Sequence, residues 1–238
     1  MDERIYKIEF DEENHKYYYL DESNHHRELH GVTGAIGKML GKTFPDTDVV
    51  KLATIYGHDV HKDSEQWIKE KQTPSTESGK WVVSYLTELR DTKGVEYFDA
   101  ELLVSDFTGT ASCIDIVAFL PDNKAILFDI KTTSVFDREY CSLQLSVYKR
   151  LFEQNYGRTV EGMFVLGTKS KRAFRILEKP SSKVDKILAM NKAIIGGIET
   201  MAKSTKYGSA DTRRSFMGCT ECGGANAKSF CNVNPYLT

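Results

Sequence analysis

The chain lacks the features that mark membrane and secreted proteins. None of its apolar runs approaches the roughly 20 residues that a transmembrane helix needs. Its opening, MDERIYKIEF, does not have the basic-then-apolar pattern of a signal peptide. Its five cysteines are an odd number, and three of them lie near the end, so a secreted disulfide framework is not expected. We therefore expect a cytoplasmic protein with no membrane partner.

The chain also has little net charge. A formal charge of −2 over 238 residues gives no sign of nucleic-acid binding, so any basic surface has to be local. Hydrophobic residues make up 40% and charged residues 28%, which is ordinary for a soluble globular protein with a core. We expect a single domain over residues 1–205, with a hairpin extension over 1–30. The Cys- and Gly-rich tail over 206–238 is either flexible or metal-binding.

Two predicted strands near the middle of the chain carry the most information. The apolar run AILF over residues 125–128 is typical of a strand buried on both faces. Because side chains two apart share a strand face, Asp129 and Lys131 emerge together. Asp115 lies on the preceding strand, and the intervening PDNK has the composition of a turn. The pattern therefore predicts a hairpin that brings Asp115 towards Asp129.

This arrangement of charges predicts a metal site. Two converging carboxylates repel unless a cation lies between them, and hard cations such as Mg²⁺ take oxygen ligands. Lys131 would then face a phosphate. On the following predicted helix, Gln144 and Tyr148 lie one turn apart. Together these residues indicate metal-dependent cleavage of a phosphodiester.

These elements, in this order, resemble the PD-(D/E)XK nucleases, and within them the RecB-like and phage-type exonuclease branch. The matching motifs are Asp115, then Asp129-Ile130-Lys131, then Gln144-x-x-x-Tyr148, preceded by Gly57-x-x-x-His61. The resemblance covers roughly residues 5 to 175. It implies an α/β fold with a restriction-endonuclease-like core: a mixed central sheet of about five strands flanked by helices, with an N-terminal β-hairpin.

The resemblance also implies roles for individual residues. Mg²⁺ or Mn²⁺ would be held by side chains and one main-chain oxygen, namely His61, Asp115, Asp129 and the carbonyl of Ile130. The catalytic residues would be Asp115, Asp129, Lys131, Glu101, Gln144 and Tyr148. Two positions have competitors, since Glu96 is an alternative to Glu101 and His58 precedes His61 by one turn. Imidazole suits Mn²⁺ better than Mg²⁺.

Substrate contacts are expected in two loops. Thr133 and Ser134 follow the Lys131 strand and offer hydroxyls to a phosphate. Between two further predicted strands, Lys169, Lys171 and Arg172 form a basic turn, which is either a DNA contact or a solvated loop.

The tail poses a separate question. Cys219, Cys222 and Cys231 are a candidate second metal site, because relatives with an iron–sulfur cluster place three cysteines near the end and one upstream. This chain has no cysteine before Cys113. A cluster or a zinc site would therefore need a non-cysteine ligand, Cys113 or Cys141, or a second chain.

Other segments predict ordinary elements. Residues 5–20 alternate around the turn DEEN and predict a hairpin, whose tyrosines at 17–19 either cover the core or stack on bases. Thr33 is a candidate N-cap of a short helix, and Gly94 a candidate left-handed cap. Residues 181–203 predict a long amphipathic helix.

The resemblance thus predicts a phage-type DNA exonuclease acting in DNA processing or recombination. It implies DNA as a partner, a recombinase or single-strand-annealing protein as another, and a bacterial or phage-infected cell, with an oligomer left open. The alternatives are a CRISPR-adaptation or RecB-type accessory nuclease with an iron–sulfur cluster, and a catalytically inactive DNA-binding module on the same fold.

Overall fold

The structure, a computed structural model, describes residues 1–11, 14, 16–23, 25–42 and 48–193, with the backbone alone described at 49–51. The described residues all belong to one compact unit. The tail over 206–238, with Cys219, Cys222 and Cys231, lies outside the described residues, so the cysteine site stays a prediction. Among the described residues, no helix combines the length and apolar character that a membrane crossing requires.

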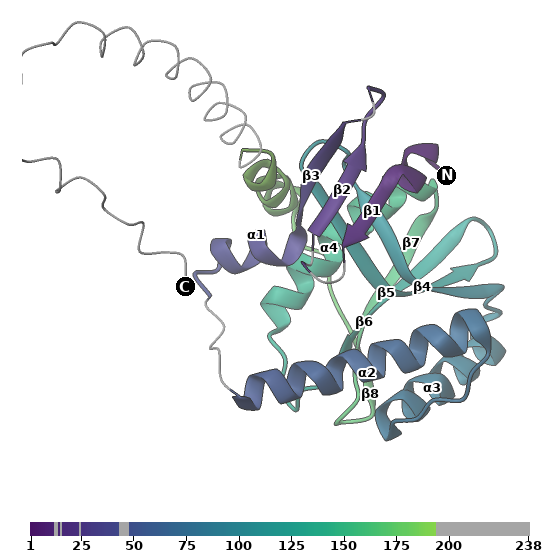
Figure 1. The fold of residues 1–238 in the computed structure, drawn as a ribbon. Helices are drawn as coiled ribbons and strands as arrows, with labels where there is room; N and C mark the ends of the chain where they lie inside the picture. The colour runs from purple at the N-terminus through teal and green to yellow at the C-terminus, as the bar shows by residue number, and fades with distance from the viewer. Residues whose placement is uncertain (12–13, 15, 24, 43–47, 194–238) are drawn as a thin grey trace, which may run out of the picture. The chain divides into compact units, whose positions relative to one another are not determined.

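Strands and helices come in runs along the described chain: three strands, three helices, three more strands, one helix and two strands follow a short 3₁₀ helix (Figure 1). The strands are β1 (Ile8–Asp11), β2 (Lys16–Leu20), β3 (His26–Gly31), β4 (Tyr97–Ser105), β5 (Thr110–Leu120), β6 (Lys124–Lys131), β7 (Thr159–Gly167) and β8 (Arg172–Arg175). The helices are the 3₁₀ helix η1 (Glu3–Lys7), α1 (Val32–Met39), α2 (Asp48–Glu70), α3 (Glu77–Lys93) and α4 (Arg138–Tyr156). Residues 181–193 are also helical, and the rest of that predicted helix lies outside the described residues.

The described strands form one mixed eight-stranded sheet in the order β1-β2-β3-β5-β6-β7-β8, with β4 paired to β5. The prediction of a mixed α/β fold is confirmed, but the prediction of about five strands is wrong. The extra strands come from the N-terminal segment, because β3 follows the expected β1–β2 hairpin and pairs in parallel with β5, His30 opposite Thr110. This pairing joins the extension to the main sheet.

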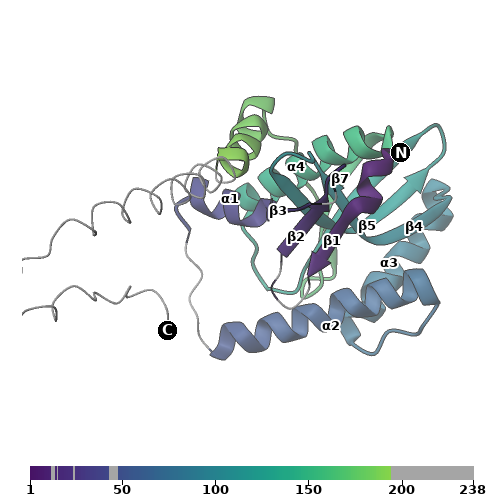
Figure 2. The ribbon, with the colours of Figure 1, turned by 45° about the horizontal axis from the view of Figure 1, so that its top comes forward.

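Helices cover both faces of the sheet. On one face α2 and α3 lie side by side (Figures 1 and 2) and bury a core that includes Val60, Leu86 and Phe128. On the other face α1 and α4 bury a second core that includes Ile36, Leu127 and Phe152. Strand β6 therefore lies between two helical layers, which explains its unbroken apolar run.

Local signals set several boundaries. Gly94 ends α3 with a φ of 64°, as predicted, because glycine adopts the left-handed conformation without steric cost. Asp122 and Asn123 have φ values of 57° and 59° and turn β5 into β6, as the PDNK composition indicated. The Thr33 prediction is wrong: α1 starts at Val32, and its N-cap, Gly31, makes no side-chain capping bond.

The first half of α2 extends past the sheet (Figure 1). Leu52 is 67% exposed and Ile55 is 59% exposed, although both belong to the apolar stripe of this helix. Val60, further along the helix, is fully buried against the sheet. Leu52 and Ile55 therefore do not belong to the core that α2 forms with the sheet.

Candidate functional site

Three carboxylates lie in a row across neighbouring strands. Glu101 on β4 lies opposite Asp115 on β5. The pairs on either side of them are Ala100 with Ile116 and Leu102 with Ile114. Asp129 on β6 directly follows the pair of Ile116 with Phe128. The antiparallel ladders thus bring the three acids to one level of the sheet, from segments far apart in the chain.

The backbone changes direction at this level. Glu101 has a φ of 51°, in the left-handed region that is uncommon for a residue other than glycine. Ala100 belongs to the core beneath α2 and α3, whereas Leu102 packs against the core beneath α4. In a regular strand these two side chains would share a face, so the strand turns over at Glu101. A conformation of this kind costs about 1–3 kcal/mol and is typical of functional sites.

His61 on α2 reaches the row from one face. Its Nδ1 lies 3.5 Å from Glu101 Oε1 and 3.7 Å from Asp115 Oδ2. One ligand atom from each of these three residues lies within 4.8 Å of the others. The structure therefore brings together two carboxylates and an imidazole, a donor set that suits Mn²⁺ and accommodates Mg²⁺.

Asp129 and Lys131 face the α4 side and form an ion pair. Lys131 Nζ lies 2.8 Å from both carboxylate oxygens of Asp129, which is only 1% exposed. Oδ2 makes no hydrogen bond among the described residues, but the Lys131 ammonium lies against it. The ammonium thus compensates the charge of a carboxylate that would otherwise be buried and unpaired.

Asp115 is tied to the next strand through its side chain. The main-chain N–H of Ile130 donates a hydrogen bond of 2.6 Å to Asp115 Oδ2. This bond fixes Asp115 beside the Asp129–Lys131 pair. The main-chain oxygen of Ile130, expected as a metal ligand, stays a prediction.

Asp115, His61 and Lys131 hold their protons to higher pH than usual. The pKa of Glu101 is lowered instead, because burial is outweighed by its hydrogen bonds with His61 and Cys113. Burial raises the pKa of Asp115 to about 7, although His61 acts against this. Burial lowers the pKa of His61, but Asp115 and Glu101 outweigh it and raise this pKa to about 9. For Lys131, burial is outweighed by Asp129 and Asp115, so its pKa is raised and the ammonium stays charged at neutral pH. A divalent cation would replace a proton in such a cluster.

Gln144 and Tyr148 lie on α4, and Tyr148 is close enough to Asp115 to be affected by its charge. Gln144 Nε2 and Ser112 Oγ both donate to the buried Tyr148 hydroxyl, at 2.9 and 3.1 Å. Gln144 Oε1 is buried and has no hydrogen-bond partner. Burial raises the pKa of Tyr148, and the Asp115 carboxylate raises it further. Gln144 and Tyr148 are thus hydrogen-bonded to each other, and Gln144 Oε1 is an acceptor without a partner.

Two residues that the sequence suggested for other roles, Tyr17 and Cys113, lie near the site, and the sequence did not place them there. Tyr17, on β2, is buried, and this burial raises its pKa. Cys113 and Glu101 raise the pKa further, whereas a hydrogen bond with Ser112 lowers it. Its burial, with that of Tyr19, favours the core alternative over base stacking. Burial raises the pKa of the Cys113 thiol, and the adjacent Glu101 raises it further. Cys113 is two residues before Asp115, a spacing that could have drawn attention to it.

The two expected substrate loops lie near the end of β6. Thr168 N–H donates to the Lys131 carbonyl at 3.0 Å, which places the turn carrying Lys169, Lys171 and Arg172 beside Lys131. Lys169 Nζ lies 5.0 Å from the centre of the Tyr56 ring. Thr133 Oγ1 donates to the Val135 carbonyl, and Ser134 is exposed.

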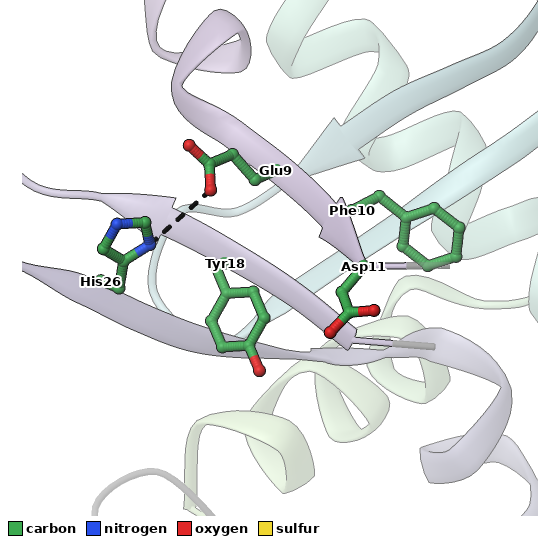
Figure 3. Close-up of a pocket in the computed structure, with 5 residues that line it drawn as sticks. All are labelled: Glu9, Phe10, Asp11, Tyr18 and His26. Carbon is green, nitrogen blue, oxygen red and sulfur yellow. Dashed lines mark ion pairs between the residues drawn. The ribbon is translucent and has the colours of Figure 1, made fainter. Parts of the chain in front are cut away.

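A shallow cavity elsewhere is less suited to catalysis. It measures about 340 Å³ and lies on the outer face of the N-terminal strands, lined by Glu9, Phe10, Asp11, Tyr18 and His26 (Figure 3). His26 Nδ1 and Glu9 Oε2 are 3.8 Å apart, and both side chains are more than half exposed. Solvent screening makes such a pair weak.

Comparisons with known proteins add little. No protein-family model and no curated protein matches the chain. Solved structures do align with it, among them a crystal structure described as "Putative exonuclease" from Eubacterium rectale. That alignment has 12% identity, covers 71% of this chain and 79% of the other, and has a TM-score of 0.35. A similarity of this size establishes neither a family nor an activity.

Proposed function

We propose that this protein is a divalent-metal-dependent deoxyribonuclease of the PD-(D/E)XK type, acting as an exonuclease with Mg²⁺ or Mn²⁺. The observation that carries the proposal is the convergence of Glu101, Asp115 and His61 beside the Asp129–Lys131 pair. Acidic oxygens, an imidazole and a fixed ammonium together match the needs of phosphodiester hydrolysis.

Each residue has a distinct part in this proposal. His61, Glu101, Asp115 and Asp129 would hold the cation, which supplies Lewis acidity towards a phosphate when bound. Lys131 stays charged and stabilises the negative charge that develops on the phosphate oxygens. Gln144 Oε1, buried and without a hydrogen-bond partner, can accept a hydrogen bond and so is available to orient a water.

The test uses single- and double-stranded DNA labelled at the 5′ or the 3′ end, with Mg²⁺ or Mn²⁺ and with chelator. We expect cleavage only with the cation. Asp115→Asn and Lys131→Met should each reduce the rate at least about 100-fold, on the scale of losing one essential charge stabiliser. Asp122→Asn, in the turn at the far end of the hairpin, is the matched control and should cleave normally.

Two outcomes would reject the proposal. If Asp115→Asn cleaves at the wild-type rate in the same metal, the carboxylate row is not the active site. If the wild-type protein binds DNA but cleaves nothing, the alternative of an inactive DNA-binding module is favoured. The position of the label on the first products identifies the end from which degradation starts.

A further inference from the structure

A second cavity, of about 420 Å³, lies on the other side of β4 from His61. Phe98 and Ala100 on β4 pack beneath α2 and α3. Because neighbouring side chains of a strand point to opposite faces, Tyr97 and Asp99 point to the α4 face, and the cavity opens there. Tyr97 lies four residues before Glu101, towards the far end of the hairpin from Lys131. The cavity is lined by polar, charged and aromatic side chains and by apolar ones, among them Ile5, Tyr6, Tyr97, Asp99, Leu102, Phe119 and Arg158.

Aromatic rings from separate segments form its apolar walls. The rings of Tyr97 and Phe119 stack with centres 4.3 Å apart and planes 13° apart. Phe119 is buried, whereas Tyr97 is 47% exposed and keeps part of its ring surface open. Tyr6 from η1 is 73% exposed and lines the same cavity. Rings held by packing on one side and open on the other are suited to stacking on a flat ligand.

The cavity also has one charged acceptor, Asp99, and one charged donor, Arg158. Asp99 is an acceptor, with Oδ1 bound by the N–H of Ala100 at 2.8 Å. Arg158 lies over the Phe119 ring at 5.0 Å, and its Nη1 donates to the Leu120 carbonyl at 3.3 Å. Arg158 Nη1 also lies 3.9 Å from Glu96 Oε2. Because a guanidinium has five N–H donors, Arg158 has others to offer a ligand.

We propose that this cavity binds a single unpaired nucleobase. A base presents a flat face for the tyrosines and an edge with both donors and acceptors for Asp99 and Arg158. Guanine fits best, because its amino group can donate to a carboxylate while O6 and N7 accept from a guanidinium. The volume lies within the range of small-ligand pockets. The site contains none of the carboxylate row, so it binds a base whether or not the protein cleaves DNA.

The test is a titration of the full chain with 2′-deoxyguanosine, which has no phosphodiester bond that the protein could cleave. Methyl resonances of Ile5 and Leu102, which line the cavity, report binding there. We expect saturable shifts with 2′-deoxyguanosine and none with 2-deoxyribose 5-phosphate, which has no base. The absence of a saturable shift, or equal affinity for benzamide, would overturn the proposal, since benzamide is an aromatic amide without the edge of a base.

Variants separate stacking from general loss of structure. Tyr97→Ala and Tyr6→Ala should each weaken binding roughly tenfold to a hundredfold, as expected for losing a stacked ring, whereas Tyr97→Phe keeps the ring and binds normally. Tyr6→Ala changes an exposed side chain, so it tests the site even if Tyr97→Ala folds poorly. Tyr18→Ala, in the cavity of Figure 3, is the matched control and should bind like the wild type. Unchanged affinity in both tyrosine-to-alanine variants rejects the site.

Discussion

Asp115 accepts the main-chain N–H of Ile130 through Oδ2, and the same oxygen lies 3.7 Å from Nδ1 of His61. One carboxylate thus links β5, β6 and α2. Asp115 can still bind a cation while it accepts the N–H of Ile130, because a carboxylate has about four lone-pair positions and this bond uses one. The geometry of the whole site therefore depends on this residue.

The first prediction concerns pH and the metal-free protein. His61 has a pKa of about 9 in the folded state, so its contribution to stability is complete below about pH 6.5 and is lost as the pH rises to 9. The pKa of Asp115 is raised to about 7, so this residue also makes the folded state less stable as the pH rises. Its contribution to stability is lost between about pH 4 and 7. We expect the free energy of unfolding in chelator to fall by about 1–3 kcal/mol between pH 6 and 9.

Urea unfolding at pH 6.0, 7.5 and 9.0 measures this fall. Asp115→Asn removes the main charge that raises the His61 pKa, so its stability should vary less over the same range. A wild-type protein that becomes more stable towards pH 9, relative to Asp115→Asn, would contradict the assignment.

The second prediction concerns metal preference. His61→Asn should lower the affinity for Mn²⁺ at least about tenfold and the affinity for Mg²⁺ less, because imidazole is a better ligand for Mn²⁺. The decrease of the free Mn²⁺ signal in electron paramagnetic resonance measures binding, and competition gives the Mg²⁺ value. His58→Asn, on an exposed position of the same helix, is the control. If the two substitutions lower the metal affinity equally, His61 is not a metal ligand.

The third prediction concerns the connection between α2 and α3. The buried Asp63 accepts four hydrogen bonds, from the N–H and hydroxyl of both Ser75 and Thr76, at 2.6 to 3.0 Å. Burial raises the pKa of Asp63, but these bonds outweigh it and lower the pKa below its ordinary value. Asp63→Asn should therefore destabilise the fold by about 2–4 kcal/mol, since an amide cannot accept all four bonds.

The midpoint of urea unfolding at pH 7 measures this loss. The contribution of Asp63 is present above about pH 4 and is lost only as the pH falls through its lowered folded value. Asp59→Asn, on an exposed position one turn earlier, should stay within about 0.5 kcal/mol of the wild type. A similar small change for Asp63→Asn would show that these bonds add little.

The fourth prediction concerns the basic turn between β7 and β8. Lys169→Ala should weaken binding of a single-stranded oligonucleotide and reduce the slope of log affinity against log salt by about 0.7, the value for one lost phosphate contact. Lys124→Ala, at the opposite end of β6 and paired with Glu161 at 3.3 Å, is the control. If both substitutions change the slope equally, the turn has no special contact with DNA.

The parts of the fold that follow local rules were predictable. Alternation and an apolar run located β6, and turn composition located its hairpin with β5. Gly94 marked the end of α3 for the same reason, because its conformation is a property of one residue. The strand β3, HRELHG, has too few apolar residues to be recognised, and it is stabilised by pairing with β5 some 80 residues away.

The sequence by itself determined the acids, the lysine, their order and the two strands that carry Asp115 and Asp129. Only the tertiary structure decided that Glu101 turns β4 over, and that Glu101, Asp115 and His61 come close together. Side-chain periodicity describes what one segment does alone. Distances between segments depend on register, twist and helix packing, which no single stretch of sequence contains.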